Sequence, residues 1–217
     1  MNYFIVISMN LFINYFDHSN SKRKKEIEFC LKKNEENEHI KRVVIVNRNE
    51  RCTYGNFFDA MFAYPNEVNI IANSDIYFDD TIQLARTIEY NQCYALTRWE
   101  LVNGKVIDFR SRHGVPSPPR WSQDVWIFKG SINSSEFHTV VATNLNNNKS
   151  EVIPFSLGIP GCDNKIAAML KEKGMQVINP SLSIRAIHVH EDSSRVYPKY
   201  MILKGIKPNG LVEQIRL

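Results

Sequence analysis

The sequence predicts an α/β fold in which a mixed, mostly parallel sheet is flanked by helices, and two observations support this prediction. Short apolar runs rich in β-branched residues alternate with longer stretches of helical periodicity. The chain has 217 residues, of which 43% are hydrophobic, so it can bury a core without disulfides or structural metals. Because strands that alternate with helices form sheets covered on both faces, we expect a single Rossmann-like domain.

The expected strands are runs of mainly apolar residues, and RVVIV at Arg42–Val46 is typical of them. They lie at Tyr3–Ser8, Arg42–Val46, Val68–Ala72, Cys93–Arg98, Asp124–Phe128 and Ser183–His190. Helices are expected to begin near Ser21, to cover Tyr54–Tyr64, to follow a capping box of Asp80 with Gln83, and to cover Asp163–Lys173. The segment Arg110–Trp121, which contains three prolines and a glycine, and the polar segment Asn144–Ser150 are expected to be loops.

Charge and cysteine usage narrow the class of protein. The net charge of +4 suits a phosphate-bearing ligand but is too small to indicate nucleic-acid binding. The four cysteines stand singly at irregular spacing, which argues against a zinc site or a disulfide framework and favours a reducing compartment, so we expect a cytoplasmic protein. The longest apolar stretch is interrupted by Asn10 and Asn14 and is too short to span a membrane.

The most informative segment is Asn69–Thr81, where a buried strand runs directly into polar residues. Ligands of open α/β sheets bind beyond the carboxyl ends of strands, and Asp75 lies at that position. A carboxylate that works with phosphate oxygens and water is a common way to hold Mg²⁺ or Mn²⁺. Asp75 is therefore a candidate metal ligand, with a turn-capping role as the alternative. For Asp79 and Asp80 we favour the capping role.

Two histidines, His188 and His190, alternate along the last expected strand. Residues two apart on a strand point to the same face of the sheet, so both imidazoles are expected to lie on one side. From the residues alone they are either packed or solvated histidines, or ligands.

Several phrases occur in an order that resembles a known family. They are Asn73-Ser74-Asp75, CYALTRWE at Cys93–Glu100, SQDVWIF at Ser122–Phe128, LGIPGCDNKIA at Leu157–Ala167 and NPSLSIRAIHVHEDSSRVY at Asn179–Tyr197. Together they resemble the GT-A glycosyltransferases, in particular the compact domains that large algal DNA viruses encode to glycosylate their capsid protein. Asn73-Ser74-Asp75 then corresponds to a variant of the family's DxD motif.

The resemblance implies a metal-dependent glycosyltransferase that moves a sugar from a UDP-sugar to a glycan or glycoprotein acceptor. Residues 1–100 would form the nucleotide-binding half and residues 101–217 the acceptor side of one domain. The cofactor would be Mn²⁺ or Mg²⁺. Its ligands would be Asp75 and a histidine that follows the final strand, for which we choose His190 with His188 as the second candidate.

The resemblance also assigns the donor pocket to the ends of the first two strands and to the helix that follows them. Candidate nucleotide-binding residues there are Ser8, Asn10, Arg48, Arg51 and Tyr54, with Asn73 and Asp75 at the metal motif and Arg195 near the histidines. Arg51 and Arg195 would meet phosphates, and Tyr54 or Phe57 would stack on the base. Core packing is the alternative for the aromatic residues.

Two carboxylates are candidates for the chemistry at the sugar. Asp163 is expected at a helix start, where the resemblance places the general base of inverting enzymes; a helix cap is the alternative. Asp124, at the start of a strand, is expected to hold sugar hydroxyls.

Two rival functions are considered. A nucleotidyltransferase would normally carry a glycine-rich loop after its first strand, but the sequence there is SMNLFINYF. A non-catalytic module that binds nucleic acid or glycan is favoured only by the basic run Ser21–Lys25 and the basic loop Arg110–Arg120. Because glutamates follow the first run, we interpret it as a solvated helix face and expect no nucleic-acid partner.

Overall fold

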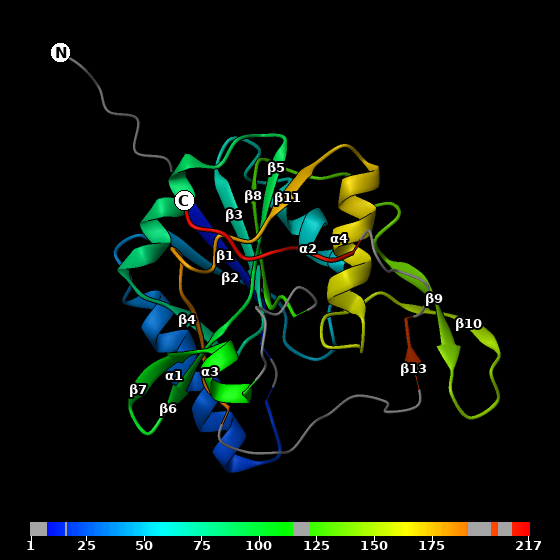
Figure 1. Ribbon diagram of the computed structural model, residues 1–217, viewed down its shortest axis with the longest axis horizontal. Coiled ribbons are helices and arrows are strands. Elements are labelled where there is room, and N and C mark those ends of the chain that lie inside the picture. Colours follow the sequence, from blue (N-terminus) through cyan, green and yellow to red (C-terminus); the bar gives the residue numbers. More distant parts are fainter. Residues whose placement is uncertain (1–7, 16, 115–121, 191–200, 204–209) are drawn as a thin grey trace.

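A six-stranded mixed sheet forms the centre of the protein (Figure 1). The computed structural model describes residues 8–15, 17–114, 122–190, 201–203 and 210–217. In spatial order the strands are β11 (Gln176–Ile178), β5 (Gln92–Leu96), β8 (Val125–Lys129), β3 (Val68–Ala72), β1 (Met9–Asn14) and β2 (Arg42–Asn47). Only β8 runs antiparallel to its neighbours in this sheet. The predicted α/β fold with a mixed, mostly parallel sheet is confirmed.

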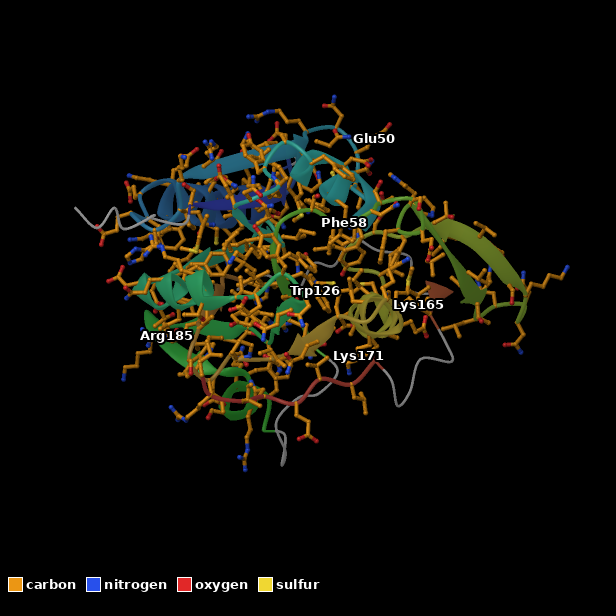
Figure 2. All side chains as sticks on the ribbon, turned by 90° about the horizontal axis from the view of Figure 1, so that it is seen from above. Glu50, Phe58, Trp126, Lys165, Lys171 and Arg185 are labelled. Carbon is orange, nitrogen blue, oxygen red and sulfur yellow. The ribbon has the colours of Figure 1, made fainter. Side chains whose placement is uncertain are left out.

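Helices cover both faces of this sheet, and each face has its own apolar core. On one face α2 (Tyr54–Met61) and α4 (Cys162–Glu172) pack on strand residues such as Phe12 and Trp126. On the other face the 3-10 helix η1 (Asp80–Thr87) packs on Leu11 and its neighbours, while α1 (Ser21–Glu35) packs on β2 and β4. Figure 2 shows Phe58 and Trp126 in the interior. None of the described helices is long and apolar enough to cross a bilayer.

Two smaller sheets flank the central one. The four-stranded sheet has the order β4 (Ile76–Phe78), β12 (Ala186–His188), β6 (Trp99–Val102) and β7 (Lys105–Asp108), and the short helix α3 (Phe109–His113) follows β7. The three-stranded sheet has the order β10 (Ser150–Pro154), β9 (Thr139–Asn144) and β13 (Met201–Ile202). The four-stranded sheet matters most for function, because it joins segments that follow β3 and β5 to one near the end of the chain.

The first strand differs from the prediction. Residues 3–7 lie outside the described part of the chain, and β1 runs from Met9 to Asn14, so Asn10 lies inside the strand rather than at its end. The structure shows how a strand accommodates a buried asparagine. Asn10 donates to Asn69 and Glu67, each at 3.0 Å, and accepts from Arg42 at 2.8 Å. These bonds compensate the loss of water, so polarity alone did not mark the strand's end.

The helix starts agree with the prediction in part. α1 begins at Ser21, as predicted, with Asn20 as its cap. The favoured capping role is confirmed for Asp79, whereas Asp80 lies in the first turn of η1 and does not cap it. Gly161, with φ of 85°, precedes α4. The β6–β7 hairpin was not predicted, although its turn, Asn103-Gly104, has positive φ at both residues and is a strong hairpin signal.

Candidate active site

A pocket of about 650 Å³ opens at the carboxyl ends of β1 and β3. Since β2 pairs with one side of β1 and β3 with the other, this edge is a topological switch point, where open α/β sheets bind ligands. Asn14, the last residue of β1, lines the pocket and accepts a hydrogen bond from the backbone of Cys52 at 2.9 Å. Further lining residues come from the turn after β3, from the segment before β8, from the start of α4 and from the segment that follows β12.

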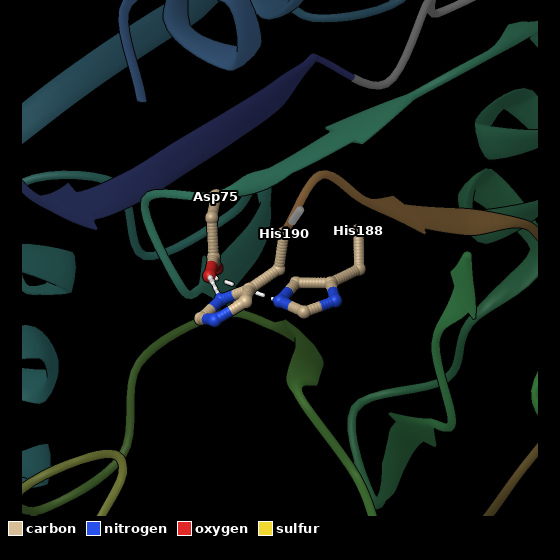
Figure 3. A group of neighbouring side chains, drawn as sticks. All are labelled: Asp75, His188 and His190. Carbon is tan, nitrogen blue, oxygen red and sulfur yellow. Dashed lines mark hydrogen bonds and ion pairs between the residues drawn. The ribbon is translucent and has the colours of Figure 1, made fainter. Parts of the chain in front are cut away.

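Asp75, His188 and His190 meet at one side of this pocket (Figure 3). His188 Nε2 lies 3.0 Å and His190 Nδ1 3.8 Å from Asp75 Oδ2. One candidate ligand atom from each residue lies within 4.8 Å of the other two. Asp75 Oδ1 is buried and has no hydrogen-bond partner among the described residues. A buried carboxylate oxygen without a partner, beside two imidazoles, fits a divalent cation such as Mn²⁺.

Backbone pairing explains why these three residues meet. The chain turns after β3 at Asn73, whose carbonyl accepts from the backbone of Ile76 at 3.1 Å. It then continues as β4, which pairs antiparallel with β12 so that His188 lies opposite Ile76. The backbone N–H of Val189 donates to the carbonyl of Asp75 at 2.9 Å. The sheet therefore holds the turn and the histidine segment in register.

The charges around Asp75 keep it ionised. Burial alone would raise the pKa of Asp75, but His188, His190 and Arg23 hold it well below its usual value. For His188 burial acts in the other direction and would lower its pKa. The carboxylates of Asp75 and Glu100, which flank the imidazole, outweigh burial and raise the pKa of His188 to about 9. In the absence of a cation His188 is thus positively charged at neutral pH.

Arg23 corrects one interpretation of the sequence. It belongs to the basic run that was expected to be a solvated helix face, but its side chain is buried. It donates to Asp75, to Glu26 at 2.7 Å and to the carbonyl of Val189 at 3.1 Å. Since it neutralises part of the acidic charge at Asp75, α1 contributes to the site.

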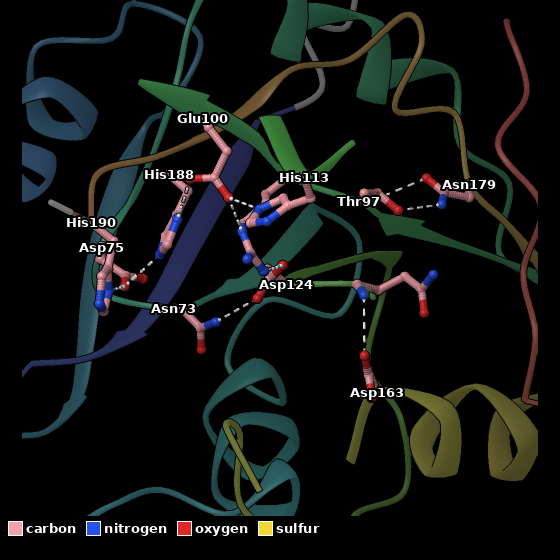
Figure 4. Close-up of polar contacts among 12 residues, drawn as sticks. Asn73, Asp75, Thr97, Glu100, His113, Asp124, Asp163, Asn179, His188 and His190 are labelled. Atoms are coloured by element: carbon pink, nitrogen blue, oxygen red, sulfur yellow. Dashed lines mark hydrogen bonds and ion pairs between the residues drawn. The ribbon is translucent and has the colours of Figure 1, made fainter. Parts of the chain in front are cut away.

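Asp124 lines the same pocket as the histidines and is drawn with them in Figure 4. Arg98 donates to its Oδ2 at 2.8 Å, and the side chain of Asn73 donates to its Oδ1 at 3.2 Å. Arg98 also donates to Glu100 at 2.6 Å. Asp124 is therefore fixed by two side chains, and Asn73 links it to the turn that carries Asp75.

Asp163 lies in the first turn of α4 and lines the same pocket. It accepts from the backbone of Asn164 at 3.0 Å and, weakly, from that of Gln123 at 3.4 Å. Burial and the nearby charge of Asp124 raise the pKa of Asp163 to about 7. A carboxyl group with this pKa can accept a proton near neutral pH, as a general base must.

The structure brings together some of the predicted nucleotide-binding residues and not others. Arg51, Tyr54 and Asn73 line the pocket, but the ring of Tyr54 is buried against Phe155 and Trp126. Three others do not join them: Ser8 and Asn10 lie at the opposite end of β1, and Arg48 stacks on Tyr15 away from the pocket lining. Arg195 lies outside the described residues, so its predicted role stays a prediction.

Several residues of the pocket were not predicted from the sequence. Asn14 was overlooked because the first strand was placed too early. Glu100 and His113 come from the missed hairpin and the short helix after it, and Gln123 precedes Asp124. Recognising the Asn-Gly turn would have placed Glu100 on a strand, but no local signal shows that this strand pairs with the histidine segment.

Comparisons with known proteins give one structural match. No protein-family model and no curated protein matches the sequence. The chain is similar to a mannosyltransferase from Pyrobaculum calidifontis, solved in complex with GDP-Man and Mn²⁺, with a TM-score of 0.49 and 10% identity. The match covers 88% of this chain and 59% of the mannosyltransferase chain, so this chain spans less than two thirds of that protein.

Proposed function

We propose that the protein is a metal-dependent glycosyltransferase that uses a nucleoside-diphosphate sugar. The observation that carries the proposal is the group of Asp75, His188 and His190 in a pocket at the switch point of the sheet, with one Asp75 oxygen lacking a partner. A cation held there would also bind diphosphate oxygens, because hard divalent ions are usually coordinated by a few protein ligands together with oxygens of the substrate's phosphates. We favour a UDP-sugar as donor, in line with the resemblance in the sequence motifs.

Some side chains of the pocket are proposed to bind the diphosphate of such a donor, and others to bind its sugar. Arg51 and Arg112 line the pocket and supply positive charge for phosphates. The cation, when bound, would neutralise the departing diphosphate as a Lewis acid. Asp124 is held in place by Arg98 and Asn73, which suits a carboxylate that accepts hydrogen bonds from sugar hydroxyls.

Asp163 is the proposed general base. Its raised pKa and its place in the pocket lining fit a group that takes the proton from an acceptor hydroxyl as the new glycosidic bond forms. In this assignment the reaction inverts the anomeric configuration, since the acceptor attacks the face opposite the leaving diphosphate. The acceptor is proposed to be a glycan or glycoprotein, and a viral capsid protein in a host cytoplasm is the case that the sequence resemblance favours.

A donor panel tests the proposal directly. Nucleotide release is measured with Mn²⁺ for a set of UDP-sugars and GDP-sugars, with and without oligosaccharide acceptors, and the products are analysed by mass spectrometry. We expect metal-dependent release from one UDP-sugar, abolished by a chelator and restored by added Mn²⁺. Release that persists in the chelator, or nucleotide binding that ignores Mn²⁺, would contradict the proposal.

A further inference from the structure

We propose that Glu100 is a positioning residue that orients His188 so that its Nε2 atom points at the cation. The inference rests on the proposed function, because it concerns the same metal site. Glu100 lies on β6, and the parallel pairing of β6 with β12 places it directly beside His188. Figure 4 shows its carboxylate facing the imidazole, and Glu100 Oε2 lies 2.9 Å from His188 Nδ1.

The environment of Glu100 leaves it little freedom to move. The residue is only 6% exposed. Its second oxygen, Oε1, accepts from Arg98 Nε at 2.6 Å and lies 3.3 Å from His113 Nε2. The two carboxylate oxygens therefore have different partners, and His188 is the partner of Oε2.

The two nitrogens of His188 have different roles for this reason. Glu100 holds the hydrogen on Nδ1, so Nε2 is the atom that faces Asp75, at 3.0 Å, and the cation site. Metal-binding histidines commonly donate their other ring N–H to a carboxylate, which fixes the tautomer and the ring orientation. Loss of such a partner typically lowers metal affinity 10- to 100-fold.

The substitution Glu100→Gln separates this role from simple packing. A carboxylate offers two acceptor oxygens, one for Arg98 and one for His188, whereas a glutamine amide offers one. The charged Arg98 is the stronger donor and should keep the remaining oxygen. The amide N–H₂ then faces Nδ1 of His188 and favours the tautomer that carries its hydrogen on Nε2. A protonated Nε2 has no free lone pair and cannot bind the cation.

The experiment measures binding of Mn²⁺ alone, without nucleotide, by electron paramagnetic resonance of the free ion. Pulsed measurements on protein with ¹⁵N-labelled histidine then count the coordinated imidazoles. Glu67→Gln is the matched control, since Glu67 also accepts from an arginine, Arg42 at 2.9 Å, but lies at the opposite end of the central sheet. Thermal unfolding of each variant checks that the fold is intact.

We expect Glu100→Gln to bind Mn²⁺ 10- to 100-fold more weakly and to show one coordinated imidazole where the native protein shows two. Glu67→Gln should match the native protein in both respects. Unchanged affinity in Glu100→Gln, or weaker binding with both imidazoles still coordinated, would overturn the inference. A native protein that binds Mn²⁺ through both histidines but transfers no sugar would refute the proposed function alone.

Discussion

The two ends of the central sheet each carry a polar cluster that is at least partly buried, and the two clusters differ in how completely their groups are paired. At the end where β1 begins, four polar side chains form hydrogen bonds with one another and with a backbone carbonyl; they are Asn10, Arg42, Glu67 and Asn69. At the pocket end, Asp75 keeps an oxygen with no partner among the described residues. Similar residue types thus form a closed structural network at one end, and at the other a site with capacity left for a ligand.

The largest effect is expected on the chemical step at the pocket end. Asp163→Asn should lower kcat by about 10²- to 10⁴-fold while nucleotide-sugar affinity stays close to native, because a general base acts in the transition state. Single-turnover kinetics and calorimetry measure the two quantities. If Asp163→Asn turned over at the native rate, Asp163 would not be the general base and its role would be limited to the first turn of α4.

The pKa of Asp163 gives this prediction a pH signature. Because that pKa is raised to about 7, the base is protonated below pH 7, and kcat should rise as the pH increases through 7. The sign for stability is opposite. The folded state binds the proton more tightly than the unfolded state, so this group's contribution to stability falls between about pH 4 and pH 7 and then levels off. Asp163→Asn should therefore gain stability relative to the native protein at pH 8 more than at pH 4.

The next largest effect is expected on metal binding. Asp75→Asn should weaken Mn²⁺ binding by about 100-fold or more, since it removes the charged ligand and not just its support. Calorimetric titration of Mn²⁺ and of UDP in the presence of Mn²⁺ measures the loss. An Asp75→Asn protein with native Mn²⁺ affinity would show that the three side chains form a structural cluster like the one at the other end.

At the opposite end of the sheet the effect should be on folding instead. Asn69 is fully buried and donates to the carbonyls of Tyr64 and Gly130. Asn69→Leu leaves these partners unpaired and should lower the free energy of unfolding by about 2 kcal/mol or more. Chemical denaturation measures that loss, and Mn²⁺ affinity should not change. A change in metal affinity would break the contrast between the two ends.

The smallest effect is expected at Asp124. Asp124→Asn keeps a polar side chain in place but weakens its charged hydrogen bond to Arg98, so donor affinity should fall by roughly tenfold or less. The comparison of KM with kcat tests this, since a donor-gripping residue mainly changes KM. A loss of kcat alone would exchange the roles of Asp124 and Asp163.

The sequence was sufficient to predict the parts of the fold that depend on local pattern. The buried run Val68–Ala72 followed by a polar turn predicted β3 and the position of Asp75, and alternation predicted that His188 and His190 share a side. Apart from the β6–β7 hairpin, whose Asn-Gly turn is a local signal that was not used, the part that failed depends on pairing between distant segments. Whether Asn10 ends a strand depends on Asn69 and Arg42, and the role of Glu100 depends on β6 lying beside β12.

The pairing of β12 with β4 has a consequence for how the protein is made. It joins His188 to Asp75 across 113 positions of the chain. Contacts of such long range form only after a large loop has closed. During synthesis, residue 75 leaves the ribosome long before residue 188 exists, so the cluster cannot assemble until most of the chain has been translated. Cation uptake would therefore report that β12 has paired with β4, and a chain cut before β12 would have no site to load.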